Sequence, residues 1–120
     1  MRTLDGVGAS QVFTGLGDPF QNRAIEELAL SIPSADARVL EVGCATGRML
    51  SRLKKADCEV VGVDLHDGNR IQDPNIRYIQ ADAKDLPLHE DMFDLTLACH
   101  VLEHVPDYGQ ALTELVRVTK

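Results

Sequence analysis

The chain has 120 residues, of which 44% are hydrophobic, and it carries a formal net charge of −7 at pH 7. A chain of this length forms one domain and buries about two thirds of the surface that its unfolded form exposes. No block of Lys or Arg concentrates positive charge, and no run approaches the roughly 18 apolar residues that span a bilayer. Composition therefore argues against nucleic-acid and membrane partners and favours a cytoplasmic protein that binds a small molecule.

The three cysteines, Cys44, Cys58 and Cys99, show no CxxC spacing. An odd number without that spacing argues against a disulfide framework and against a zinc knuckle. We therefore expect reduced intracellular thiols.

Residues 1–20 contain four glycines and a proline without sustained periodicity, so we expect an irregular N-terminal arm there. The core is expected over residues 21–120. From Gln21 onward apolar residues recur at helical spacing until Pro33 interrupts the pattern. This segment predicts a first helix with one buried face.

A continuous apolar run at residues 38–42 predicts a strand that is covered on both faces. A helical pattern follows at 47–55, and a second apolar run follows at 59–65. Together the three segments have the length that a right-handed parallel crossover needs. They predict a strand, helix, strand unit.

Two shorter strand signals follow at residues 75–80 and 93–99. Helical spacing returns after Pro106, with Asp107 in the position of an N-cap. Strands that alternate with helices indicate an α/β fold with a mostly parallel sheet.

The first strand of the crossover unit runs into a loop with the spacing Glu41-x-Gly43-x-Ala45-x-Gly47. Such a loop at the start of a helix offers backbone N–H groups to a polar ligand, and its small residues let the ligand approach closely. A dinucleotide fingerprint would place glycine at positions 43, 45 and 48, but Ala45 and Arg48 occupy the last two. The pyrophosphate interpretation is therefore weakened, and a purely structural turn is the alternative.

Two acids follow the next two strands. Asp64 lies at the end of the 59–65 segment, where a carboxylate can accept hydrogen bonds from both hydroxyls of a ribose, with Leu65 beside the base. Nicotinamide enzymes place an acid similarly, so Asp64 alone does not distinguish a nicotinamide cofactor from another cofactor that contains a ribose. The second acid, Asp82, follows the 75–80 strand and precedes Ala83.

These motifs, in this order, resemble class I S-adenosylmethionine-dependent methyltransferases, and the segment Cys99-His100-Val101-Leu102-Glu103-His104 resembles the small-molecule methyltransferases called type 11. The resemblance covers residues 22–120. It implies a Rossmann-like, doubly wound sheet and S-adenosyl-L-methionine as cofactor, with the adenine at Asp82 and Ala83. The cofactor contacts that it implies are Glu41, Gly43, Cys44, Ala45, Gly47, Asp64, Leu65, Asp82, Ala83, Cys99 and His100.

The resemblance also implies transfer of a methyl group to an acceptor, with a small molecule as the expected class. No catalytic base is assigned by the sequence; His104 is a candidate to take a proton from an oxygen acceptor. The letters His100-x-x-Glu103-His104 match an inverted zinc-protease motif, but Pro106 disfavours helix at Val105. We therefore expect no metal.

The sheet of this family has seven strands in the order 3-2-1-4-5-7-6, and this sequence supplies the first four, in the order 3-2-1-4. We therefore expect a truncated domain that lacks the acceptor half. The strand at 93–99 would then have an unpaired apolar edge, which predicts a homodimer through that edge or a longer parent protein. Two other functions stay open: a non-catalytic half-domain that binds S-adenosylmethionine or dimerises, and an NAD-binding half, which Arg48 disfavours.

Overall fold

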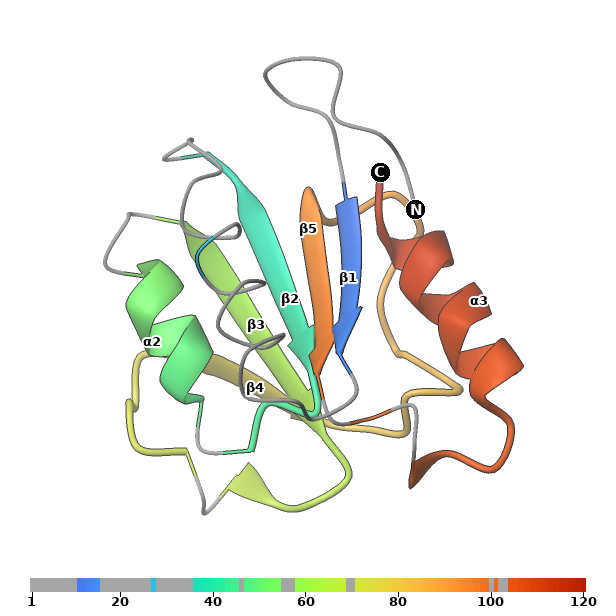
Figure 1. Ribbon diagram of the computed structural model, residues 1–120. Helices are drawn as coiled ribbons and strands as arrows, with labels where there is room; N and C mark the ends of the chain where they lie inside the picture. The colour runs from blue at the N-terminus through green and yellow to red at the C-terminus, as the bar shows by residue number, and fades with distance from the viewer. Residues whose placement is uncertain are drawn as a thin grey trace.

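The computed structural model describes residues 11–15, 27, 36–45, 47–54, 58–68, 71–99, 101 and 104–120. Within these ranges the chain forms a single five-stranded sheet with helices packed against it (Figure 1). The strands are β1 (Gln11–Gly15), β2 (Arg38–Val42), β3 (Glu59–Asp64), β4 (Arg77–Gln80) and β5 (Leu95–Cys99), and the helices are α2 (Arg48–Lys54) and α3 (Tyr108–Val118). The helix expected between Gln21 and Pro33 lies outside the described residues, apart from the exposed Glu27.

The strands lie in the order β1-β5-β2-β3-β4, and all four neighbouring pairs are parallel. Read from β4 to β5, this order is the predicted 3-2-1-4, so the expected sheet is confirmed. The crossover through α2 joins β2 to its neighbour β3, as the strand, helix, strand unit requires. The carboxyl ends of these strands therefore meet at one edge of the sheet.

The N-terminal segment differs from the prediction. Residues 11–15 form β1, which pairs with β5 from Gln11 opposite Leu95 to Gly15 opposite Cys99. The expectation of irregular structure is therefore wrong for these five residues. The expectation that the 93–99 strand has an unpaired edge is wrong too, because β1 occupies it. The four glycines and the proline that suggested an irregular arm obscured a short strand that is stabilised by pairing rather than by its own pattern.

The sheet is covered on both faces, as a doubly wound fold requires. On one face Leu50 and Leu53 of α2 pack with Val39 and Val60. On the other face three residues of α3 pack against β2 and β3. The helix residues are Ala111, Leu115 and Val118, and the strand residues are Leu40, Val42, Val61 and Val63. This two-sided burial explains why β2 and β3 read as continuous apolar runs rather than as alternating patterns.

Both ends of α3 are capped by side chains. Asp107 is the N-cap, as predicted, and its Oδ1 accepts a hydrogen bond from the Gln110 N–H at 3.4 Å. At the other end the buried Thr119 hydroxyl donates to the Leu115 carbonyl at 2.6 Å and lies 2.7 Å from the Thr96 hydroxyl of β5. Thr119 thereby ties the end of α3 to the sheet. In the described part of the chain, neither helix has the length and apolar character needed to cross a membrane.

Candidate functional site

The glycine-spaced loop between β2 and α2 has a backbone that only small residues adopt easily. Gly43, Ala45 and Gly47 have positive φ values of 76°, 49° and 77°. A Cβ atom on Gly47 would lie 3.0 Å from the Cδ1 atom of Ile76, so this position is also restricted by packing. The glycine spacing in the sequence marked this loop, and its backbone conformation and packing explain its composition.

The loop is held against the carboxyl end of β3. The N–H groups of Gly43 and Cys44 donate to the Val63 carbonyl at 2.7 and 3.2 Å. The Ala45 N–H donates to Asp64 Oδ2 at 3.0 Å, and the His66 N–H donates to Asp64 Oδ1 at 3.2 Å. Each carboxylate oxygen has two lone pairs, so the half-buried Asp64 keeps acceptor capacity for a ligand. The glycine-spaced loop and Asp64, the first two predicted motifs in chain order, are therefore in direct contact.

Glu41 is the buried acid beneath this loop. Its side chain is 6% exposed, and among the described residues its Oε1 atom has no hydrogen-bond partner. Burial, together with the nearby Asp64 carboxylate, raises the pKa of Glu41 from its ordinary value of 4.5 to about 8. A cationic group placed beside Glu41 would favour the ionised form of this carboxyl group and lower its pKa again. These acceptor groups thus fit the positively charged end of a zwitterionic ligand such as S-adenosylmethionine.

Cys44 has a packing role in this arrangement. Its side chain is buried, and burial, with Glu41 and Asp64 nearby, raises the pKa of its thiol to about 12. The thiol is therefore not a nucleophile at neutral pH. Cys44 Sγ lies 2.8 Å from where a Cβ atom of Gly62 would be, so the thiol fills the space that this glycine leaves on β3.

The third predicted motif follows β4. The Ala81 N–H donates to the Asp64 carbonyl at 3.0 Å, which places this turn beside the second motif. The Lys84 N–H donates to Asp82 Oδ1 at 2.9 Å, and the Asp82 side chain is exposed. Ala83 is 6% exposed and packs in the cluster under α3. Asp82 is therefore accessible to a ligand, whereas the side chain of Ala83 is not.

Leu65 is 63% exposed at the same edge. Two side chains of β4 that no sequence motif marked hold the backbone at residues 64–66. Gln80 Nε2 donates to the Leu65 carbonyl at 2.9 Å. The Tyr78 hydroxyl, which has a single proton, lies within hydrogen-bonding distance of the carbonyl oxygens of Asp64 and His66. Both β4 residues looked like ordinary edge-strand residues, so no local signal marked them.

The fourth motif is described only in part. Cys99 ends β5 and pairs with Gly15 of β1, while His100 lies outside the described residues. The exposed His104 donates its backbone N–H to the Val101 carbonyl at 3.0 Å. Within the described residues no three His, Cys, Asp or Glu side chains gather as a metal site. The proposed contacts of Cys99, His100 and His104 stay predictions.

Comparison of the sequence with known proteins identifies a family. The model of the methyltransferase domain family called Methyltransf_11 matches residues 40–120. The chain is 31% identical over 96 residues to a ubiquinone/menaquinone biosynthesis C-methyltransferase of Idiomarina loihiensis, covering 69% of this chain and 38% of that protein. It is 32% identical over 95 residues to a demethylmenaquinone methyltransferase of Clavibacter sepedonicus, covering 73% of this chain and 39% of that protein.

A solved structure extends this likeness to three dimensions. A SAM-dependent methyltransferase of Thermotoga maritima superposes with a TM-score of 0.63 at 27% identity, covering 79% of this chain and 45% of that chain. This chain thus spans less than half the length of each of these three proteins. Its matched residues include the loop at 43–47 and both acids that follow it. The chain therefore belongs to the family of class I S-adenosylmethionine-dependent methyltransferase domains.

Proposed function

We propose that this chain binds S-adenosylmethionine at the carboxyl edge of its sheet and takes part in transferring the methyl group to a small-molecule acceptor. The single observation that carries the proposal is the Asp64 carboxylate, which accepts the Ala45 N–H while remaining half-exposed. This contact joins the loop and the strand-end acid into one polar surface. Family membership supports the identity of the ligand, and the geometry supports where it binds.

Each group at this edge has a proposed part in holding the ligand. Asp64 accepts hydrogen bonds from the ribose hydroxyls, Asp82 accepts one from the adenine amino group, and the exposed Leu65 covers the base. The loop at residues 43–47 faces the amino-acid end, and the buried Glu41 stabilises positive charge there. Cys44 shapes the loop from below.

When bound, S-adenosylmethionine supplies an electrophilic methyl group on a sulfonium sulfur that leaves as a neutral thioether. The contribution of this chain is to orient that group and to keep water from it. A nucleophilic carbon, nitrogen or sulfur acceptor needs little acid or base chemistry from the protein. For an oxygen acceptor, His104 is the proposed proton acceptor.

The names of the relatives support a small molecule as the acceptor. One curated relative is named for ubiquinone/menaquinone biosynthesis, and the other is named a demethylmenaquinone methyltransferase. We extend from them only the class of acceptor, because this chain spans about two fifths of their length. Binding of S-adenosylmethionine without turnover on any acceptor would instead favour the non-catalytic half-domain.

Titration calorimetry with S-adenosylmethionine tests the proposal. We expect the wild-type chain to bind and the Asp64→Ala variant to bind more weakly by about 1–3 kcal/mol, because a charged acceptor for the ribose hydroxyls is lost. That loss corresponds to roughly a 5- to 150-fold increase in the dissociation constant. Asp67→Ala removes the same charge from an exposed position three residues away and serves as the control.

Two results would contradict the proposal. One is a folded wild-type protein that does not bind S-adenosylmethionine. The other is an Asp64→Ala variant with unchanged affinity, which would remove the ribose assignment. A folded state is verified for each protein by circular dichroism and by a cooperative urea transition.

A further inference from the structure

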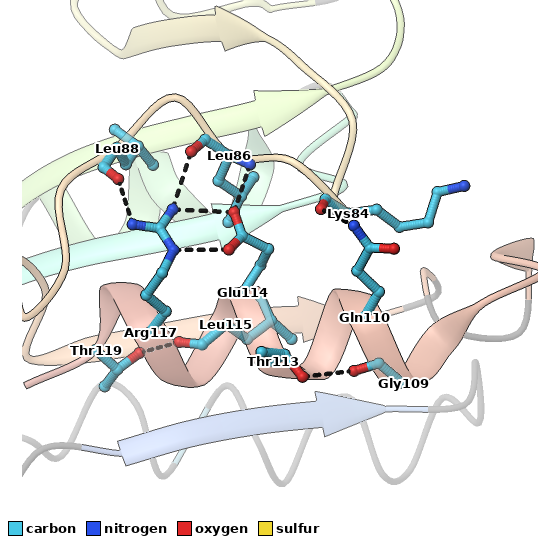
Figure 2. A network of polar contacts seen from close by, with 10 residues as sticks. All are labelled: Lys84, Leu86, Leu88, Gly109, Gln110, Thr113, Glu114, Leu115, Arg117 and Thr119. Atoms are coloured by element: carbon cyan, nitrogen blue, oxygen red, sulfur yellow. Dashed lines mark hydrogen bonds and ion pairs between the residues drawn. The ribbon is translucent and has the colours of Figure 1, made fainter.

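Three side chains on one face of α3 hold the segment that connects β4 to β5 (Figure 2). Gln110, Glu114 and Arg117 are spaced four and three residues apart, so they line up along the helix. Figure 2 shows them facing the backbone of Lys84, Leu86 and Leu88. We call these three side chains the α3 clamp.

The central pair of the clamp is an ion pair with two hydrogen bonds. Arg117 Nε and Nη2 donate to Glu114 Oε1 and Oε2 at 2.6 and 2.9 Å. Hydrogen bonding to Arg117 lowers the pKa of Glu114, and Glu114 in turn raises the pKa of Arg117. Because guanidinium and carboxylate are both planar, this two-point contact fixes their orientation. Arg117 then has further N–H hydrogens, and Glu114 further lone pairs, for the connecting segment.

These further N–H groups and lone pairs of Arg117 and Glu114 bind backbone groups of the connecting segment. Arg117 Nη1 donates to the Leu88 carbonyl at 2.9 Å, and Nη2 donates to the Leu86 carbonyl at 3.0 Å. Glu114 Oε2 accepts the Leu86 N–H at 2.7 Å, while the side chain of Leu86 is 3% exposed. A lysine at position 117 could not reproduce this planar set of contacts. The segment is therefore held by its main chain as well as by its apolar side chain.

The third member of the clamp leads directly to the proposed adenine contact. Gln110 Nε2 donates to the Lys84 carbonyl at 3.0 Å. The N–H of the same Lys84 donates to Asp82 Oδ1 at 2.9 Å, and the Asp85 N–H donates to the Asp82 carbonyl at 3.0 Å. Fixing Lys84 from α3 thus fixes one oxygen of the Asp82 carboxylate and leaves the other, Oδ2, for a ligand.

We propose that the α3 clamp positions Asp82, and that it thereby determines the preference of this site for a purine that carries a 6-amino group. This inference rests on the proposed function. Gln110, Glu114 and Arg117 are positioning residues, because they act through Lys84 and Leu86 and do not face the ligand. A clamp that only stabilised α3 would lower the affinity for all ligands of the site alike.

The test compares two ligands whose bases differ in the group at purine position 6 and, with it, in whether the neighbouring N1 carries a proton. S-adenosylhomocysteine has an amino group at purine position 6, whereas S-inosylhomocysteine has a carbonyl oxygen, which a carboxylate repels. We measure both dissociation constants by titration calorimetry for the wild type, Gln110→Ala and Arg117→Lys. In both variants we expect affinity for the adenosine compound to fall by about 3- to 10-fold and affinity for the inosine compound to change less than about twofold.

Two further variants calibrate the measurement. Asp82→Asn removes the carboxylate itself and should reduce the preference at least as far as the clamp variants do. Thr113→Ala is the matched control, because its hydroxyl donates at 3.0 Å to Gly109 within the helix and not to the connecting segment. Gln110 is exposed, so Gln110→Ala should fold normally even if Arg117→Lys does not.

The outcomes separate this inference from the proposed function. If Gln110→Ala lost affinity for both ligands equally, or kept its affinity for both, the positioning role would be overturned and the proposed function would stay intact. Wild-type protein that binds both ligands equally would also overturn it alone. Wild-type protein that binds neither would overturn both.

Discussion

At the scale of the single residue, Glu41 places a carboxyl group where folding removes it from water. The pKa of Glu41 is about 8 in the folded protein against 4.5 ordinarily, so the folded state holds this proton more tightly than the unfolded state. Its favourable contribution to stability is therefore fully present below pH 4.5 and is lost as pH rises through about 8. We expect Glu41→Gln to remove this loss and to exceed the wild type in stability above pH 8.

Urea denaturation between pH 5.5 and pH 9 measures the effect. The stability difference between Glu41→Gln and wild type should grow with pH, by roughly a few kcal/mol, because one pKa unit corresponds to about 1.4 kcal/mol. Glu59→Gln is the control, since the Glu59 side chain is 56% exposed at the other end of the sheet. A difference that stays constant across this range would contradict the protonated, buried state of Glu41.

Gly62 is a second residue whose surroundings predict a measurable effect. A Cβ atom there would lie 2.8 Å from Cys44 Sγ and 2.9 Å from Leu50 Cδ1. We expect Gly62→Ala to destabilise the fold by about 1–3 kcal/mol through overpacking. Cys44→Ala removes the thiol, so the double variant should lose less stability than the sum of the two single variants. Additive losses in urea denaturation would show that Cys44 and Gly62 do not compete for this space.

The site residues show which features of the site could be predicted from the sequence. The spacing of Gly43, Gly47 and Asp64 was sufficient to identify the loop and the acid, because backbone conformation and strand ends impose it. The hydrogen bond from Ala45 to Asp64 could not be predicted, since it depends on how the loop folds back on β3. The supports from Tyr78 and Gln80 were missed because their side chains act on the backbone of a distant segment.

At the scale of the element, β1 is held by its partner and by one apolar side chain that the structure describes. Val12 is partly buried against the cluster under α3 and pairs with Thr96. We expect Val12→Asp to detach β1, lower stability by about 1–3 kcal/mol and expose the edge of β5. Urea denaturation and sedimentation velocity check the two effects, with self-association through the edge of β5 expected only for this variant.

Val12→Thr has nearly the shape of valine and serves as the control for this strand. It should lose stability without gaining a tendency to associate, because threonine remains favourable in a strand. Val12→Asp protein that sediments and unfolds like the wild type would contradict the pairing of β1 with β5. The homodimer predicted from the sequence is a separate proposal, and any such dimer would need a surface other than this occupied edge.

The elements also differ in how well they could be predicted. β2 and β3 were found within one residue of their observed bounds because long apolar runs mark them, and the start of α3 was found because helical spacing and the Asp107 cap agree locally. The fourth predicted strand begins later than expected, at Leu95, because Phe93 pairs with Thr119 in an isolated bridge instead of joining the strand. β1 was missed because five residues without alternation carry too little local information.

At the scale of the whole molecule, the parallel arrangement brings the site together. Glu41, Asp64 and Asp82 are distant in sequence, yet each lies at or just beyond the carboxyl end of a neighbouring strand. The topology was predictable because a parallel crossover and the family resemblance both lead to the same strand order. What was not predictable is that a segment preceding the first motif would extend the sheet beyond β5.

The pairing of β1 with β5 has a consequence for how the chain folds. Gln11 lies opposite Leu95, whereas Arg38 lies opposite Glu59, so the first contact closes a much longer loop of chain than the second. Because loop closure must precede the gain from pairing, strand partners far apart in sequence assemble slowly. Assembly should therefore begin at the crossover around α2 and finish with the N-terminal strand. During biosynthesis a strand that leaves the ribosome before the rest of the sheet would be the last one to pair.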